Sequence, residues 1–278
     1  MIPSIEHRSD IPSSSKPSFT TPFYESAMLL LGSYIIALLL TTAIHEIGHG
    51  LALSSISIGF RLVLSPFSLS MAQPLSPIPT DSLLFVITAG TAMELLFGSA
   101  IFLLLWRYRN TLLVSLLMCA PVSFLSSGGY FLAGVSVADG DTALMISLGV
   151  PSLLIQALGV VFIVIGAILL ILLFPLFGIT PKDSFGRLFL ILFVGMTLHG
   201  FGMIAFASAF NPSELPIGLA NVVSMSITVL IFAGVYTRSS LFFDSLVHTE
   251  VAKLDQIAVY SAIGFALVLI VLETLFLN

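Results

Sequence analysis

Residues 27–53 read AMLLLGSYIIALLLTTAIHEIGHGLAL, and this stretch decides the class of fold. It is long enough to cross the hydrocarbon core of a bilayer, which is about 30 Å thick and needs about 20 apolar residues in a helix. The rest of the chain is similar, because 58% of its 278 residues are hydrophobic and only 8% are charged. A soluble domain usually carries about 25% charged residues. The composition therefore excludes a soluble globular protein and predicts an integral membrane protein.

Long apolar runs recur along the chain and predict an all-α polytopic membrane protein with about seven transmembrane helices. Residues 1–24 are polar and rich in Ser, Thr and Pro, which predicts a flexible tail. Residues 25–150 then hold three spans, and residues 151–278 hold four additional spans. The predicted spans are Ala27–Leu53, Leu83–Trp106, Thr111–Leu132, Pro151–Phe177, Arg187–Phe210, Ile217–Tyr236 and Ile257–Leu277.

Basic residues are unevenly divided between the two sides that seven crossings would create. Only Arg61 falls on one side, whereas eight basic residues fall on the side of the N-terminal tail. Cytoplasmic loops carry an excess of Lys and Arg, so the N-terminus is predicted to be cytoplasmic and the C-terminus to lie outside. No basic run suggests a nucleic-acid partner. The eight are Arg8, Lys16, Arg107, Arg109, Lys182, Arg187, Arg238 and Lys253.

The segment Ser57–Pro74, between the first two predicted spans, has a different pattern. Residues 67–71 read FSLSM and alternate apolar with polar side chains, which is the period of a strand. Pro66 and Pro74 bracket this alternation. We expect a short strand or hairpin after the first helix. It must be buried in protein or line a wet cavity, because unpaired backbone cannot face lipid.

The first predicted span contains the pattern His-Glu-x-x-His at residues 45–49. His45 and His49 are four residues apart, which places both imidazoles on one face of a helix. Two neutral imidazoles can bind one Zn²⁺. Glu46 is then the predicted general base, which takes a proton from water and later passes it to the leaving amine. The alternative is a polar cluster that joins helices, since ionisable groups in a membrane helix are costly unless they are paired or functional.

A catalytic zinc site needs a third protein ligand and one open position. Asp139 and Asp141 follow the third predicted span, which runs in the same direction as the first. The histidines and these aspartates therefore belong to the same side of the membrane, and one aspartate is predicted to complete the site. The alternative is structural, with Asp141 capping the next short helix and Asp139 solvated in a loop.

These motifs resemble those of the site-2 protease family of intramembrane zinc metalloproteases, over roughly residues 27–150. His45, Glu46 and His49 match the family's first motif, and Asp139-Gly140 matches the core of its Leu-Asp-Gly motif, with Ala138 in place of Leu. The resemblance implies that Asp139 is the third ligand, with Asp141 as its competitor.

The residues 89–96, AGTAMELL, resemble the family's Ala-Gly-Pro-x-x-Asn segment, with Thr91 in place of Pro and Glu94 in place of Asn. Glu94 is expected either to orient a ligand histidine through a hydrogen bond or to stabilise an oxyanion. A polar contact between two helices is the alternative role.

The resemblance implies a zinc-dependent endopeptidase that hydrolyses a peptide bond in or near a transmembrane segment of a membrane-protein substrate. The segment Ser57–Pro74 falls where the family has an edge strand that pairs with unwound substrate. In the family the motif helix usually runs toward the cytoplasm, whereas the charges here direct it away. Two other functions stay open: a membrane zinc amidase acting on a lipid, and a non-enzymatic scaffold or transporter that retains the motif.

Overall fold

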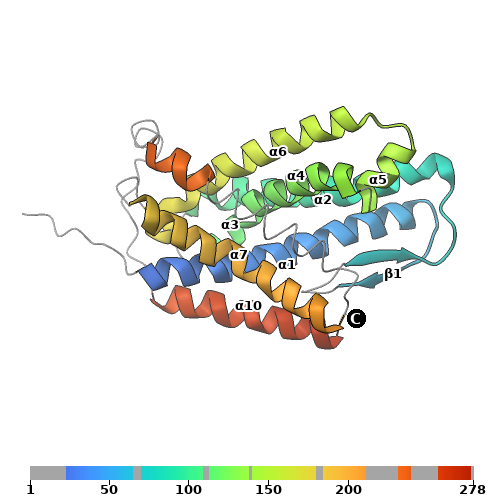
Figure 1. Cartoon of the computed structure of the whole chain (residues 1–278). Coiled ribbons are helices and arrows are strands. Elements are labelled where there is room, and N and C mark those ends of the chain that lie inside the picture. Colours follow the sequence, from blue (N-terminus) through green and yellow to red (C-terminus); the bar gives the residue numbers. More distant parts are fainter. Residues whose placement is uncertain are drawn as a thin grey trace, which may run out of the picture.

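The computed structural model of the chain is a bundle of helices with one small hairpin (Figure 1). It describes residues 23–64, 70–108, 113–137, 140–179, 184–210, 231–238 and 256–276. The elements are α1 (Phe23–Ser55), β1 (Phe60–Val63), β2 (Met71–Pro74), α2 (Thr80–Leu105), η1 (Trp106–Tyr108), α3 (Val114–Leu117), α4 (Cys119–Val137), α5 (Gly140–Ser147), α6 (Ser152–Leu173), η2 (Phe174–Phe177), α7 (Phe185–Phe210) and α10 (Gln256–Phe276), with a further helical segment at 231–238.

Within the described residues, four helical segments are long and apolar enough to cross a membrane. They coincide with the first four predicted spans, so the predicted helical architecture is present with four candidate membrane-spanning helices. The helices α7 and α10 coincide with the fifth and seventh predicted spans, but the apolar helices found within them are shorter, Phe185–Val194 and Val259–Val271. Most of the sixth predicted span, and the tail 1–22, lie outside the described residues. The total of seven spans stays a prediction. The four segments are Phe23–Ser55, Thr80–Tyr108, Val114–Val135 and Ser152–Phe177.

The third span is divided into α3 and α4 by a turn at Met118. Pro121 lies three residues after this turn, where it cannot donate a backbone hydrogen bond to the preceding turn of helix and its ring crowds that turn. The sequence predicted one continuous segment here, because hydrophobicity alone does not register a break of this kind.

α1 lies at the centre of the bundle, packed against α2, α4, α7 and α10, while α6 packs on α4. Figure 1 shows the hairpin and α5 at one end. We call this the hairpin end, and it includes the adjoining parts of α1 and α2. The opposite end, where α1 begins, is the packed end. Its core is formed by fully buried side chains that include Leu29, Leu30, Leu117, Phe174 and Phe177.

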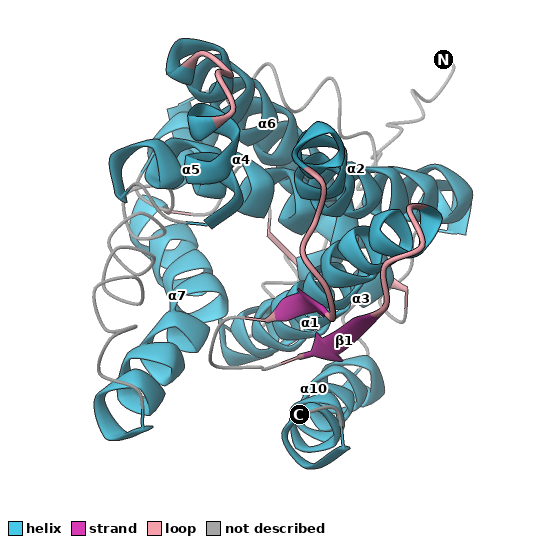
Figure 2. Ribbon diagram, turned by 90° about the vertical axis from the view of Figure 1, so that its right-hand side faces the viewer, coloured by secondary structure: helices cyan, strands magenta, loops and turns pink. Residues whose placement is uncertain are grey.

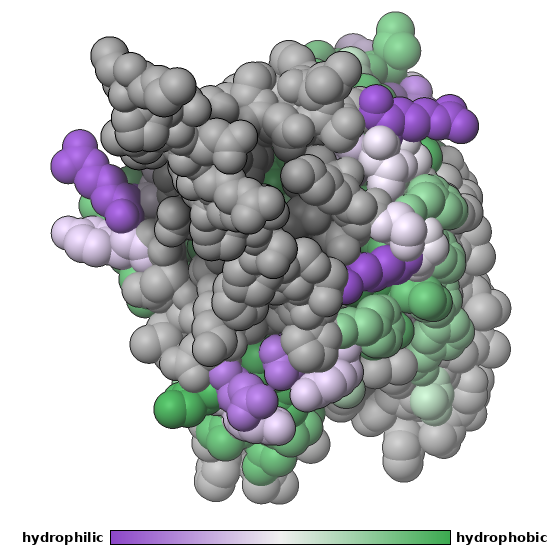
Figure 3. All heavy atoms as spheres, turned by 90° about the vertical axis from the view of Figure 1, so that its left-hand side faces the viewer, coloured by the Kyte–Doolittle hydropathy of each residue, from purple (hydrophilic) through white to green (hydrophobic). Residues whose placement is uncertain are grey.

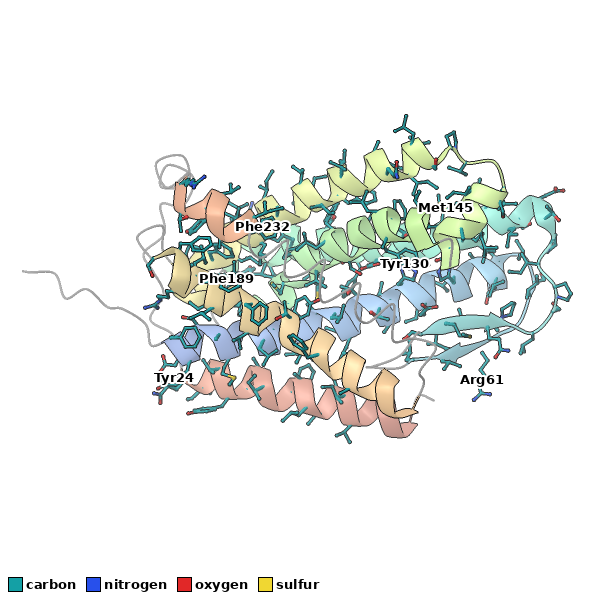
Figure 4. The ribbon with its side chains drawn as sticks, in the orientation of Figure 1. Tyr24, Arg61, Tyr130, Met145, Phe189 and Phe232 are labelled. Atoms are coloured by element: carbon teal, nitrogen blue, oxygen red, sulfur yellow. The ribbon has the colours of Figure 1, made fainter. Side chains whose placement is uncertain are left out.

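The described basic residues are divided between these two ends. Arg107 in η1, Arg187 near the start of α7 and Arg238 lie toward the packed end, which Figure 3 shows face-on with hydrophilic side chains at its margin. Arg61 of β1 lies at the hairpin end (Figure 4). The predicted grouping of these four charges is therefore present, and the orientation of the packed end toward the cytoplasm stays a prediction.

The hairpin predicted after the first span is present as the antiparallel pair β1 and β2 (Figure 2). Its register pairs Phe60 with Pro74 and Val63 with Met71. Most of the alternating residues 67–71 lie outside the described part of the chain, and β2 begins at the last of them, Met71. Pro74 was expected to bracket the strand but is its last residue, a position at which a missing N–H is tolerated.

Candidate metal centre

Two histidines of α1 and one aspartate of α5 meet at the hairpin end. The Nε2 atoms of His45 and His49 are 3.1 Å apart. Oδ2 of Asp141 lies 3.2 Å from Nε2 of His49 and 3.6 Å from Nε2 of His45. Two imidazole nitrogens and a carboxylate oxygen therefore surround one point. Within the described residues, this group can hold a metal ion.

The second nitrogen of each imidazole is held by α2. Nδ1 of His49 lies 2.7 Å from the backbone carbonyl oxygen of Val86, which can only accept, so Nδ1 carries the hydrogen and donates it. Nδ1 of His45 lies 3.0 Å from Oε2 of Glu94, a carboxylate acceptor. With both Nδ1 atoms donating, the Nε2 atoms are the nitrogens that face Asp141, and either a proton or a metal ion can lie between nitrogen and carboxylate oxygen. A metal-binding histidine has its other nitrogen engaged in this way.

Glu94 is the most deeply buried carboxylate among the described residues, with 4% of its surface exposed. Its Oε2 atom also accepts a hydrogen bond from Oγ of Ser127 on α4, at 3.3 Å. The contact with His45 is of the kind predicted for a residue that orients a ligand histidine, and it also joins α2 to α1. The oxyanion role of Glu94 stays a prediction.

Glycines bring α1 and α2 close enough for these contacts. A Cβ at Gly48 would lie 2.6 Å from the carbonyl oxygen of Ala89, so any side chain there would push the helices apart. A Cβ at Gly90 would overlap the imidazole of His49 and would lie 2.8 Å from Nε2 of His45. Gly90 therefore leaves the space that both imidazoles occupy.

Asp141 lies in the first turn of α5, and its carboxylate faces the histidines. Burial raises the pKa of Asp141, but hydrogen bonds with His45 and His49 outweigh it and lower the pKa to about 2. The carboxylate is therefore ionised at neutral pH, as a metal ligand must be. Asp139, the ligand that the resemblance implied, lies outside the described residues. Of the two predicted aspartates, the structure brings Asp141 to the histidines.

Glu46 lies beside the three-residue group without belonging to it. Its side chain is buried, and its carboxylate accepts a hydrogen bond from the backbone N–H of Ala72 in β2. Successive residues of a helix point about 100° apart, since one turn takes 3.6 residues. α1 thus directs its two histidines toward α2 and α5, and directs Glu46 toward the hairpin.

Sequence reasoning missed three parts of this site: the carbonyl group of Val86, the space left by Gly90, and Tyr130. The hydroxyl of Tyr130 on α4 accepts a hydrogen bond from the backbone N–H of Asp141, at 2.8 Å. Figure 4 shows Tyr130 in the half of the molecule that holds α5 and the hairpin. A hydroxyl-bearing ring near the end of an apolar span was the one signal that pointed to it.

Two imidazoles and one carboxylate form a donor set that could hold a metal ion, and the carboxylate of Glu46 lies beside it. Comparison with known proteins adds no relative, because no protein-family model, curated protein or solved structure matches the chain. What the site can do therefore rests on its own geometry.

Proposed function

We propose that this protein is a zinc-dependent intramembrane endopeptidase, similar in chemistry to the site-2 protease family. It would hydrolyse a peptide bond in or near a transmembrane segment of another membrane protein. One observation carries the proposal: Nε2 of His45 and Nε2 of His49 converge on Asp141, while an acceptor on α2 holds each Nδ1.

Zinc fits the residues present. It accepts imidazole nitrogen and carboxylate oxygen in tetrahedral sites, and three protein ligands leave a fourth position for water or substrate. In the proposal His45, His49 and Asp141 are these ligands. The carboxylate of Glu94 and the carbonyl group of Val86 hold the imidazoles in the binding tautomer, as partners of ligand histidines do in other zinc sites.

Glu46 is the proposed general base. When bound, Zn²⁺ would supply Lewis acidity toward a peptide carbonyl and toward water. The carboxylate of Glu46 takes the proton of the attacking water and then gives it to the leaving amine, so that no charged amide anion has to leave. The hydrogen bond that Glu46 accepts from the N–H of Ala72 holds this carboxylate on the side of the hairpin.

The hairpin supports a peptide substrate over a small lipid. β2 pairs with β1 along one edge, while the N–H of Ala72 is directed at Glu46. A substrate segment added as a strand along this second edge of β2 would lie next to Glu46. A peptide bond inside a helix is shielded by the helix, so strand pairing would also hold the unwound segment open for attack.

The length of α1 supports cleavage near one end of the substrate segment. Its 33 residues make a helix about 50 Å long, which exceeds the hydrocarbon thickness of about 30 Å. The histidines lie in the last third of this helix, beside the hairpin. The charge distribution predicts that this end is non-cytoplasmic, so the proposed cut is in the non-cytoplasmic part of the substrate segment.

The decisive experiment compares Glu46→Gln with the wild type. The full chain is purified in detergent and its zinc measured by elemental analysis, and new N-termini are mapped by mass spectrometry in membranes that contain each variant. We expect Glu46→Gln to keep its zinc and to lose cleavage by a factor of about 10² to 10⁴, the usual contribution of a general base.

Glu25→Gln is the matched control, because Glu25 is a buried carboxylate at the other end of the same helix. It should change neither zinc content nor cleavage. The proposal is contradicted if the wild type contains no zinc. It is also contradicted if every N-terminus found with the wild type is found with Glu46→Gln as well. A biological activity that persists in Glu46→Gln would favour the scaffold or transporter instead.

A further inference from the structure

The helix that carries Asp141 is too short to hold its own position. α5 has eight residues, and an isolated helix of fewer than about 12 residues is marginal. Two contacts fix its body on the bundle. Thr142 is fully buried and lies against Gly134 of α4, and Met145 packs in a cluster with Ile87 and Phe131. Neither contact sets the direction in which the first turn points.

Tyr130 is bonded to the first turn itself. The first N–H groups of a helix have no partner within the helix, and the hydroxyl of Tyr130 accepts the one that belongs to Asp141. The bond is to the backbone of the very residue whose carboxylate faces the histidines. Its donor and the Oδ2 atom of Asp141 are separated only by that residue's own short side chain.

Gly140 leaves room for the hydroxyl of Tyr130. It has φ = 64°, in the left-handed region that favours glycine. A Cβ at this position would overlap the hydroxyl oxygen of Tyr130 and would lie 3.1 Å from Cζ of its ring. The absent side chain of Gly140 therefore provides the space in which Tyr130 reaches the backbone of Asp141.

We propose that Tyr130 is a positioning residue of the metal centre, which holds the Asp141 carboxylate in place through the Asp141 backbone and depends on Gly140 for access. The inference rests on the proposed function, because it takes Asp141 as a metal ligand. It adds α4 to α2 as a helix that orients the ligands. α2 holds the imidazoles, and α4 holds the carboxylate.

The test measures metal binding by the purified full chain in detergent, with Zn²⁺ in competition with a chromophoric chelator. Tyr130→Phe removes only the hydroxyl, and we expect it to weaken the apparent affinity for Zn²⁺ about tenfold. The absorption spectrum of the Co²⁺-loaded protein should also shift, because the carboxylate ligand moves. Tyr108→Phe is the matched control, since Tyr108 is exposed in η1 at the packed end, and should change neither quantity.

A second variant pair tests the dependence on Gly140. Gly140→Ala should weaken Zn²⁺ binding by itself, because its Cβ displaces the hydroxyl. Adding Tyr130→Phe to Gly140→Ala should cause no further loss, since the bond is already broken and the overlap is relieved. Independent effects that simply add would overturn the inference, as would Tyr130→Phe with the affinity and Co²⁺ spectrum of the wild type.

These outcomes are distinct from a failure of the proposed function. A wild type that binds Zn²⁺ but cleaves nothing removes the endopeptidase and leaves the role of Tyr130 to be decided by the affinities. A wild type that binds no Zn²⁺ overturns both.

Discussion

The two ends of α1 are held by different forces. At the packed end, Leu29, Leu30 and Ala37 are fully buried among apolar side chains of the neighbouring helices. At the hairpin end, His45 and His49 each have a polar partner on α2. Lipid tails are as apolar as leucine, so close packing and hydrogen bonds, and not hydrophobicity, hold helices together in a membrane.

A change of shape at the packed end should therefore lower the free energy of unfolding, whereas one at the hairpin end should weaken metal binding. Side-chain hydrogen bonds between helices that are described at the packed end include the pair Ser33 and Ser115, with hydroxyls 3.0 Å apart, and the bond from Nε2 of Gln256 to Oε1 of Glu25, at 3.5 Å. The rest of that core depends on fit. The hairpin end depends on direction, because its bonds decide which nitrogen of each imidazole is left for a metal.

The largest effect is expected for Gly90→Ala at the hairpin end. The new Cβ would occupy the space of the His49 imidazole and crowd Nε2 of His45. Displacing the ligands themselves should weaken Zn²⁺ binding by more than about 100-fold, beyond the range of about 10- to 100-fold that is typical of changes outside the ligand set. Chelator competition on purified protein measures this loss.

Gly129→Ala is the control for Gly90→Ala, because a Cβ at Gly129 of α4 would meet nothing within 4 Å. It should bind Zn²⁺ as the wild type does. Normal zinc binding by Gly90→Ala would show that the imidazoles can move aside. Metal binding at the hairpin end would then not depend on the direction in which α2 holds the imidazoles.

A smaller effect is expected for Glu94→Gln, which keeps the shape of the side chain and removes its charge. The amide still accepts a hydrogen bond from Nδ1 of His45, but more weakly than a carboxylate. The affinity for Zn²⁺ should fall about 10-fold, the lower part of the range for such partners. Glu25→Gln, the same change at the packed end, should leave the affinity unchanged. Equal effects of the two variants would remove the distinction between the ends.

Much of the fold was predictable from the sequence, because the rule for crossing a membrane is one of length and hydrophobicity. The first four spans and the presence of a hairpin followed from composition and period. The bounds of β2 at Met71–Pro74 did not follow, since they depend on the pairing with β1 and not on the alternation of side chains. The break at Met118 was not predicted, because it depends on backbone hydrogen bonding and not on hydrophobicity.

The site was predictable only where spacing within one helix decides it. His45 and His49 had to share a face, and Glu94 was notable as a charge in an apolar helix. Spacing could not select between Asp139 and Asp141, because neighbouring residues in a loop carry no periodicity that would decide it. The carbonyl partner of His49 belongs to Val86, and a backbone acceptor leaves no mark in a sequence.

The smallest effect on the metal is expected for Gly32→Ala, the counterpart of Gly90→Ala at the packed end. A Cβ at Gly32 of α1 would lie 2.9 Å from the carbonyl carbon of Ala262 and 3.0 Å from the nitrogen of Ile263, so α10 must move away from α1. Overpacking of this kind costs about 1–3 kcal/mol of unfolding free energy, which thermal unfolding in detergent reports as a lower midpoint. Gly264→Ala is the matched control, because that glycine of α10 has open space around it, so the variant should unfold like the wild type.

Zinc binding by folded Gly32→Ala should be normal, since the imidazoles are held by α2 and the change lies against α10. A loss of zinc at temperatures where Gly32→Ala is still folded would show that strain at the packed end reaches the histidines through α1, and the two ends would then be one cooperative unit.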